Sequence, residues 1–192
     1  MAGAAGYSIY EQGAAATAQA GAFAARASDP SAVFYNPAGI ASQKAGIEIG
    51  TTLIFTSTEF DGGAPLLGIP SAKHEMEPGM FYPSTVYAVA PIGTLGLPSF
   101  VENVSVGFGF FTPFGLGTEW KNDFSGKWIS EFAEIQSFYF NPVVAVDMGV
   151  FSVGVGVQAV HATVSMKRDV RQAASWPADL AKMELEGNNG LN

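Results

Sequence analysis

The chain has 192 residues, enough for one domain or a small pair of domains; 48% of them are hydrophobic and only 14% are charged. The formal net charge of −8, with nine lysine and arginine residues scattered along the sequence, argues against nucleic-acid binding, which needs clustered cations. Because the chain has no cysteine, disulfides, thiolate metal sites and a cysteine nucleophile are excluded. No run of about 18 apolar residues predicts a membrane-spanning helix, so any membrane role must be carried by strands.

The N-terminal part of the chain is an almost uncharged leader of small residues. Residues 13–27 contain 11 alanine or glycine residues among 15, too little side-chain volume to form a core alone, so another structure must enclose them. Asp29 is placed to cap a short helical turn that begins at Pro30, and Pro37 ends it because the residue before a proline avoids the helical region. We therefore predict a small helical hatch over residues 1–43.

From residue 44 onward, apolar side chains alternate with small or polar ones, the pattern of strands whose two faces differ. In the second of these segments the more apolar face carries Phe81, Tyr87 and Val89. In the fifth, the apolar residues move after Ala159 to even-numbered positions, which we interpret as a bulge that turns the odd-numbered residues inward: His161, Thr163, Ser165 and Lys167. Five segments are predicted, over residues 47–56, 81–91, 104–110, 136–148 and 151–166.

The connections between these segments differ in length. Residues 61–77, 115–133 and 169–192 form long links, whereas residues 147–150 form a short turn. Long loops on one side and tight turns on the other are typical of outer-membrane barrels, whose strands turn apolar residues to lipid and small or polar ones to the lumen. Such a barrel must close with an even number of strands. Residues 44–192 are therefore predicted to be the first part of an all-β, antiparallel transmembrane barrel, cut in an extracellular loop.

Several stretches resemble one known family. They are Gly6-Tyr7, the small residues around Ala20-Gly21, the eleven residues Asp29–Gly39 and the strand sequence Gly107–Gly115. Together they cover nearly the whole chain and resemble the FadL/TodX family of outer-membrane long-chain fatty acid and hydrocarbon transporters. The resemblance implies a monomeric barrel of roughly fourteen strands, surrounded by bacterial outer-membrane lipid, with the hatch inside the lumen. It also implies hydrophobic ligands that enter from outside and leave sideways through the wall, without a cofactor or a metal.

The third segment is irregular at its end. Phe110 and Phe111 are adjacent, and Thr112 precedes Pro113, which cannot donate to a strand ladder and so predicts a bulge or a break. The resemblance implies that this irregularity is the sideways exit; an ordinary bulge near the extracellular rim is the alternative. The resemblance also implies that Asn36–Gly39 lies at the sideways exit in the wall. The residues alone are equally consistent with a turn that leads into the first strand.

The last link contains Trp176, Leu180 and Met183 at the spacing of one apolar helix face. We hypothesise that they line a first, weak docking site for a hydrophobic ligand; the alternative is that this face packs on a neighbouring loop. The candidate ligand-binding residues are thus Tyr7, Phe34, Asn36, Pro37, Ala38, Phe111, Trp176, Leu180 and Met183, and the candidate gating residues are Asn36, Pro37, Ala38, Gly39, Thr112 and Pro113.

The chain is not predicted to be an enzyme. No serine lies in a local nucleophile signature, no glycine-rich phosphate loop is present, and two histidines give no metal-binding pattern. An outer-membrane hydrolase and a structural or adhesive barrel are the alternatives to a passive transporter. Thr163, followed only later by Lys167 and Arg168, stands where the resemblance implies a basic partner for a fatty acid carboxylate, which leaves neutral hydrocarbons as candidate ligands.

Overall fold

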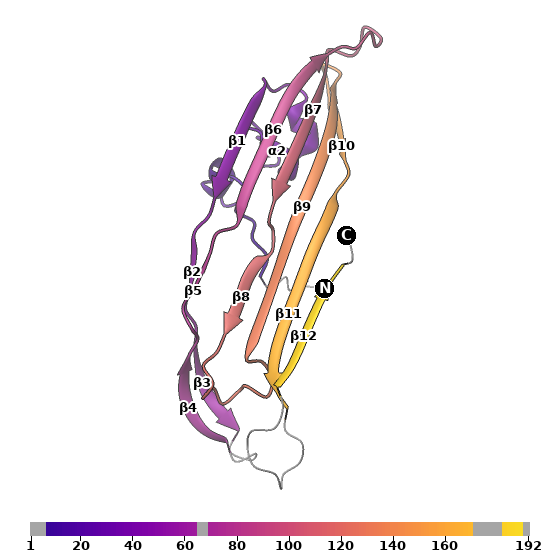
Figure 1. The fold of residues 1–192 in the computed structure, drawn as a ribbon. Helices are drawn as coiled ribbons and strands as arrows, with labels where there is room; N and C mark the ends of the chain where they lie inside the picture. Colours follow the sequence, from indigo (N-terminus) through magenta and orange to yellow (C-terminus); the bar gives the residue numbers. More distant parts are fainter. Residues whose placement is uncertain (1–6, 65–68, 171–181, 190–192) are drawn as a thin grey trace.

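The structure, a computed structural model, describes residues 7–64, 69–170 and 182–189 (Figure 1). Short helical turns come first in the chain, and strands follow. The helices are α1 (Ala14–Thr17), α2 (Ala32–Tyr35) and the 3-10 turn η1 (Pro37–Ile40). The strands are β1 (Gly46–Thr51), β2 (Ile54–Thr56), β3 (Glu59–Ala64), β4 (Ile69–Glu75), β5 (Gly79–Phe81), β6 (Ser84–Gly93), β7 (Asn103–Phe111), β8 (Gly115–Glu119), β9 (Phe132–Asp147), β10 (Ser152–Gly156), β11 (Ala159–Asp169) and β12 (Lys182–Asn188).

The strands join into long, partly interrupted segments. β1, β2 and β3 run in one direction and β4, β5 and β6 return beside them, because β1 pairs with β6, β2 with β5 and β3 with β4. β6 then pairs with β7, both β7 and β8 pair with β9, both β10 and β11 also pair with β9, and β12 pairs with β11. Every one of these pairings is antiparallel, as predicted, and the described strands form an open, curved wall (Figure 1).

Three of the predicted links contain strands, and the predictions of loops are wrong there. The hairpin of β3 and β4 lies largely within residues 61–77, β8 opens the link at 115–133, and β12 lies in the final link. In β12, charged residues alternate with Met183, Leu185 and Gly187, so this strand lacks the contrast of apolar against small residues that marks the other segments. The short β9–β10 turn and the long β8–β9 link do lie at opposite ends of the wall (Figure 1).

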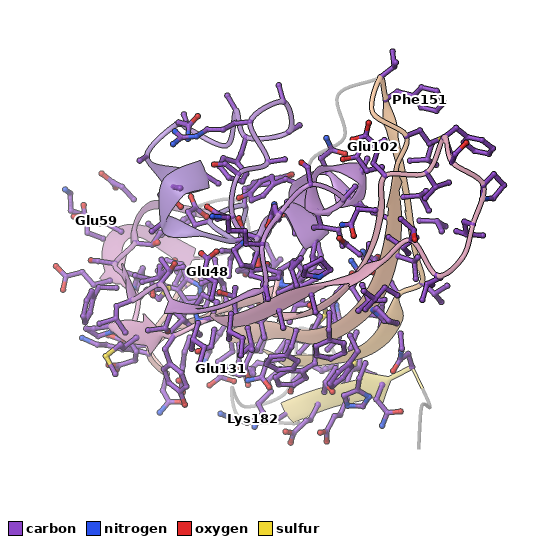
Figure 2. All side chains as sticks on the ribbon, turned by 90° about the horizontal axis from the view of Figure 1, so that it is seen from above. Glu48, Glu59, Glu102, Glu131, Phe151 and Lys182 are labelled. Atoms are coloured by element: carbon purple, nitrogen blue, oxygen red, sulfur yellow. The ribbon has the colours of Figure 1, made fainter. Side chains whose placement is uncertain are left out.

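The predicted alternation holds in the first predicted segment, which comprises β1 and β2, and on β7, β9 and β10. The outward side chains of this first segment are 58–75% exposed: Ile47, Ile49, Leu53 and Phe55. On the opposite face, Asn141 Nδ2 donates to the Val33 carbonyl oxygen at 3.3 Å, and Asn103 Nδ2 donates to the Ala41 carbonyl oxygen at 2.8 Å. Residues 13–43, which carry α1, α2 and η1 and which we call the helical segment, therefore pack on the concave face of the wall. Figure 2 shows the strands curving around this segment.

Glycines let the helical segment approach the wall closely. A Cβ atom at Gly107 would lie 2.8 Å from Ile40 Cδ1 and 2.9 Å from Val33 Cγ2, and a Cβ atom at Gly154 would overlap the backbone of Pro37 and Ala38. The hydrophobic core lies at this contact, between the helical segment and the inner faces of β6, β7 and β9: Ala27, Ala32, Val33, Ile40, Ala41, Tyr87, Val89, Phe111, Val143 and Ala145.

Strand β6 departs from the rule that apolar residues face lipid. Tyr87 and Val89 face the helical segment and are buried, while Val86 and Ala88 take the outward positions. The small side chains of the leader leave space at this point, and the wall fills it with larger ones. The Tyr87 hydroxyl also donates to Gln12 Oε1 at 3.3 Å.

The bulge predicted after Ala159 does not form. Gly156 pairs with Val143 and Ala159 pairs with Phe140, three residues further along both strands, so the register continues unbroken from β10 into β11. The odd-numbered residues therefore stay on the outer face, and the prediction that they turn inward is wrong: His161, Thr163, Ser165 and Lys167. What changes at this point is the chemistry of the two faces, because the apolar residues move to the inner one.

Candidate functional site

The third long segment breaks between β7, which ends at Phe111, and β8, which begins at Gly115. Phe111 pairs with Tyr139, and Gly115 pairs with Gln136. The chain therefore advances four residues from β7 to β8 while the partner strand β9 advances only three. The extra residue confirms the irregularity predicted around Pro113. It also reverses the faces, so that the even-numbered residues of β8 point inward.

The start of the N-terminal leader, residues 7–9, lies on the inner side of this break. The Ile9 N–H donates to the Pro113 carbonyl oxygen at 2.8 Å, and Ser8 forms a β-bridge with Phe114. The Tyr7 hydroxyl lies 3.2 Å from Thr118 Oγ1 on β8. The leader thus supplies hydrogen bonds to residues 113 and 114, which lie between the β7–β9 ladder and the β8–β9 ladder.

β5 and β8 are neighbours without a hydrogen-bonded ladder between them. Among the described residues, β5 pairs with β2 alone and β8 pairs with β9 alone. The wall is joined at one end of this gap by the pair of Thr85 and Phe111, and at the other by a bridge between Met76 and Trp120. The wall therefore has a stretch without a hydrogen-bonded ladder beside the break, which we call the opening.

A cleft of about 410 Å³ lies at this opening. Its lining draws on both faces of the wall, because Phe110 and Phe138 belong to the outer face and Ser137 to the inner face. Thr112 Oγ1 accepts a hydrogen bond from the Ser84 N–H at 3.2 Å and ties the two strands together at one end of the cleft. The lining consists of Met80, Phe81, Tyr82, Pro83, Ser84, Phe110, Thr112, Phe114, Gly115, Glu134, Gln136, Ser137 and Phe138.

Two predicted ligand-binding residues, Phe34 and Phe111, are in contact. Their rings meet edge to face with centroids 5.0 Å apart, and Phe111 also stacks on Tyr139 at 5.5 Å. Phe111 is fully buried in this arrangement. A ligand would therefore reach its ring only after the helical segment moves.

The segment Asn36–Gly39 lies away from the break, against β10 and β9. Its backbone at Pro37 and Ala38 contacts Gly154, and Asn36 Nδ2 donates to the Ala24 carbonyl oxygen at 2.8 Å. The structure does not bring this segment together with Thr112 and Pro113. Any joint role in opening the wall would have to pass through the helical segment between them.

Met183 lies on strand β12, where it pairs with Arg168, so the helix predicted through this position is wrong there. The alternation of charged and apolar residues in β12 has the period of a strand, and pairing with β11 stabilises it. Arg168 Nη2 also donates to Met183 Sδ at 3.6 Å. Trp176 and Leu180 lie outside the described residues.

The part of the wall beyond the helical segment carries an apolar inner row that the sequence analysis missed. Leu116 pairs with Ile135, Ile135 pairs with Val164, and Met166 pairs with Leu185, which places these side chains on one face across β8, β9, β11 and β12. Met166 and Leu185 are 46% and 58% exposed on this concave face. The sequence does carry a signal for this row, the move of apolar residues to even-numbered positions after Ala159. In an unbroken strand, that move places the apolar side chains on the inner face.

The helical segment is held by neutral polar groups as well as by packing. The Tyr35 hydroxyl donates to the Tyr10 carbonyl oxygen at 2.6 Å, and burial raises the pKa of this hydroxyl. Glu48 extends from β1 toward the helical segment (Figure 2), and a Cβ atom at Gly13 would lie 3.2 Å from its Oε1. Within the described part of the chain, no group of three or more histidine, aspartate and glutamate residues is arranged to hold a metal. No helix there is both long and apolar enough to cross a membrane.

An antiparallel wall whose outer face is apolar over part of its length, with a small-residue segment on its concave face, is typical of outer-membrane β-barrel proteins. Comparison with known proteins agrees with this class. The model of a family described as outer membrane protein transport protein (OMPP1/FadL/TodX) matches residues 1–191, and the chain belongs to this family. The family and the outer-membrane location are thereby confirmed as predicted, and the family is described as one of transport proteins.

Two individual proteins are similar to this chain. An outer membrane protein of Neisseria meningitidis serogroup B, NMB0088, is 31% identical over an alignment of 128 positions that covers 62% of this chain and 25% of that protein. The crystal structure of a Pseudomonas aeruginosa FadL homologue matches with a TM-score of 0.53 and 17% identity, over 83% of this chain and 42% of that one. This structural likeness supports the fold. The chain spans less than half the length of either protein.

Proposed function

We propose that this chain forms part of a channel for passive uptake of hydrophobic compounds across the outer membrane. A ligand arriving from outside would bind along the apolar inner row, pass toward the hatch of residues 1–43, and leave sideways through the opening between β5 and β8. The transported compounds would be long-chain fatty acids or hydrocarbons. The complete protein would act as a monomer in outer-membrane lipid.

The observation that carries this proposal is the position of the opening between two apolar surfaces. On the inner side lies the row from Leu116 to Leu185, and on the outer side the cleft is flanked by Phe110 and Phe138. A hydrophobic molecule can therefore move from one surface to the other with little contact with water. The hydrolase and adhesion alternatives have no comparable observation in their favour.

The predicted site residues take different parts in this route. Thr112 and Pro113 border the opening, and Tyr7 lies beside β8 on its inner side. Phe34 and Phe111 would contact a ligand once the helical segment shifts, and Asn36–Gly39 would hold that segment against β10. Met183 shares the inner face with Leu185 and would contact the ligand early.

The test is uptake of labelled oleate and labelled toluene into cells that carry or lack the complete protein. Gly115 lines the cleft and a Cβ atom there meets nothing within 4 Å, so Gly115→Phe should fill the cleft without disturbing its neighbours. We expect uptake in cells with the wild-type protein and a large loss with Gly115→Phe. Comparing the two ligands identifies the substrate class.

The matched control is Val144→Phe, which adds the same ring to the outer face of β9, away from the cleft. It should transport like the wild type. Both variants are first checked for heat-dependent gel mobility, which reports an intact barrel. Equal uptake with and without the complete protein, or equal uptake by both variants, would refute the proposed route.

A further inference from the structure

The outer face of β9, β10 and β11 is apolar over only part of its length. Its side chains there are 37–71% exposed although they are phenylalanine or valine: Phe138, Phe140, Val144, Val153, Val155 and Val157. Since the chain belongs to an outer-membrane family, lipid hydrocarbon is the partner that suits this surface.

The same outer face becomes polar further along the same strands. β9 continues with Gln136 and Glu134, and β11 pairs Thr163 with Gln136 and Ser165 with Glu134. Because the register is unbroken, these residues lie on the outer face with Phe138 and Phe140. β12 adds Glu186 opposite Ser165 and Glu184 opposite Lys167.

The change is abrupt and charged groups mark its far side. Lys167 Nζ lies 2.8 Å from Glu184 Oε1, and both side chains are well exposed. Charged side chains on the lipid-facing surface of a barrel strongly destabilise it near the bilayer midplane and cost little only near the interfaces. This part of the outer face therefore does not lie in hydrocarbon.

The length of the apolar stretch fits the hydrocarbon layer. From Phe138 to Val146 there are eight steps along β9, about 27 Å of strand at about 3.4 Å per residue. With a strand tilt of about 40°, that corresponds to about 20 Å of height, close to the apolar band of about 25 Å on outer-membrane barrels.

His161 and Phe138 stand at the transition. They pair directly across β11 and β9, and their rings are stacked with centroids 6.5 Å apart. An imidazole combines an apolar body with a polar end, which suits the level of the lipid headgroups. The adjacent position toward the short β9–β10 turn is the apolar Phe140, and the adjacent position away from it is the polar Gln136.

We infer that the hydrocarbon of the outer leaflet ends at the Phe138–His161 pair and that the wall beyond it stands outside the bilayer. The projecting part comprises the end of β11 from Thr163, β12 and the start of β9. Its apolar inner row is then enclosed by a wall whose outer surface faces headgroups and water. This inference concerns lipid contact alone and holds whether or not the proposed transport route is correct.

The absence of cysteine from these 192 residues makes the inference directly testable. Single cysteines replace Val155, Phe140, His161, Ser165 or Glu186 in the complete protein, any cysteine elsewhere in it having been replaced first, and each is spin-labelled in phospholipid bilayers. Collision with oxygen, which concentrates in hydrocarbon, is compared with collision with a water-soluble nickel chelate. All five positions lie on the outer face of the wall, so these substitutions leave the core on the concave face untouched.

The ratio of oxygen to nickel collision should be several-fold higher at Val155→Cys and Phe140→Cys than at Ser165→Cys and Glu186→Cys, with His161→Cys between them. The same five labels in detergent provide the control. In a micelle, the oxygen-to-nickel collision ratio depends on how the detergent covers the protein and not on the thickness of a bilayer. Ser165→Cys as oxygen-accessible as Phe140→Cys in bilayers would overturn the inference. So would nickel access at Phe140→Cys equal to that at Glu186→Cys.

Discussion

The Ile9 N–H donates to the Pro113 carbonyl oxygen at 2.8 Å, which joins the N-terminal leader to the break in the wall. The two residues are more than a hundred positions apart in the sequence. Pro113 lies between the ladders of β7 and β8, and its carbonyl group needs a partner when buried. The leader therefore covers the inner side of the break, and losing this hydrogen bond should loosen both parts together.

Ile9→Pro removes the donor without adding charge or much bulk. The loss of this hydrogen bond and the constraint of the proline ring should destabilise the docked leader by about 1–3 kcal/mol. We expect faster protease cleavage near the N-terminus in the purified complete protein. Ile9→Val keeps the N–H and is the control. Equal cleavage rates for the two variants would show that the hydrogen bond contributes nothing to docking.

Gly154→Ala tests the contact of the helical segment with β10. The added methyl group would overlap the backbone of Pro37 and Ala38, which cannot move away as a flexible side chain could. We expect η1 to be displaced, at a cost of about 1–3 kcal/mol. Hydrogen exchange of the amides of Asn36 and residues 38–41 measures this as lost protection.

The control for that measurement is Gly115→Ala, because a Cβ atom at Gly115 meets nothing within 4 Å. In Gly115→Ala, the amides of Asn36 and residues 38–41 should exchange like those of the wild type. If Gly154→Ala also exchanges like the wild type, then the close approach of η1 to β10 does not hold the helical segment in place.

Gln43 ties three parts of the helical segment together through one amide group. Its Nε2 lies 2.7 Å from the carbonyl oxygen of Ala27, 2.9 Å from that of Asp29 and 3.3 Å from that of Gly39. Gln43→Ala should weaken the segment by about 1–2 kcal/mol. Gln43→Glu should be worse, since a carboxylate would face three carbonyl oxygens and repel them. Limited proteolysis between residues 27 and 43 should rank the wild type, the alanine variant and the glutamate variant in that order of resistance; a glutamate variant as resistant as the wild type contradicts this role.

The features that the sequence predicts well depend on neighbouring residues alone. The outward row from Ile47 to Phe55 follows from parity, and the break follows from a proline that cannot donate. The shift after Ala159 is different, because a bulge and a change of face leave the same local pattern. Only the pairing of Gly156 and Ala159 with β9 distinguishes the two, and pairing is a long-range property.

The inward position of Tyr87 was unpredictable for a related reason. Parity divides the residues of β6 correctly into two faces, but it does not say which face meets the leader. That depends on how much volume the leader leaves unfilled on the concave side. Likewise, β12 becomes a strand because β11 offers it an edge, whereas the spacing of Trp176, Leu180 and Met183 alone predicts a helix.

Two adjacent residues of β11 offer a test of the face assignment through function. Val164 lies on the inner row and Ser165 on the outer face, so Val164→Asp and Ser165→Asp place the same carboxylate on opposite sides of one strand. A carboxylate on the inner row should weaken binding of a hydrophobic ligand by about 1–3 kcal/mol, roughly 5- to 150-fold in affinity. Uptake of labelled ligand at low concentration should fall accordingly for Val164→Asp and stay at the wild-type level for Ser165→Asp. The reverse result would restore the bulge after Ala159, because only a reversed register would place Ser165 inside.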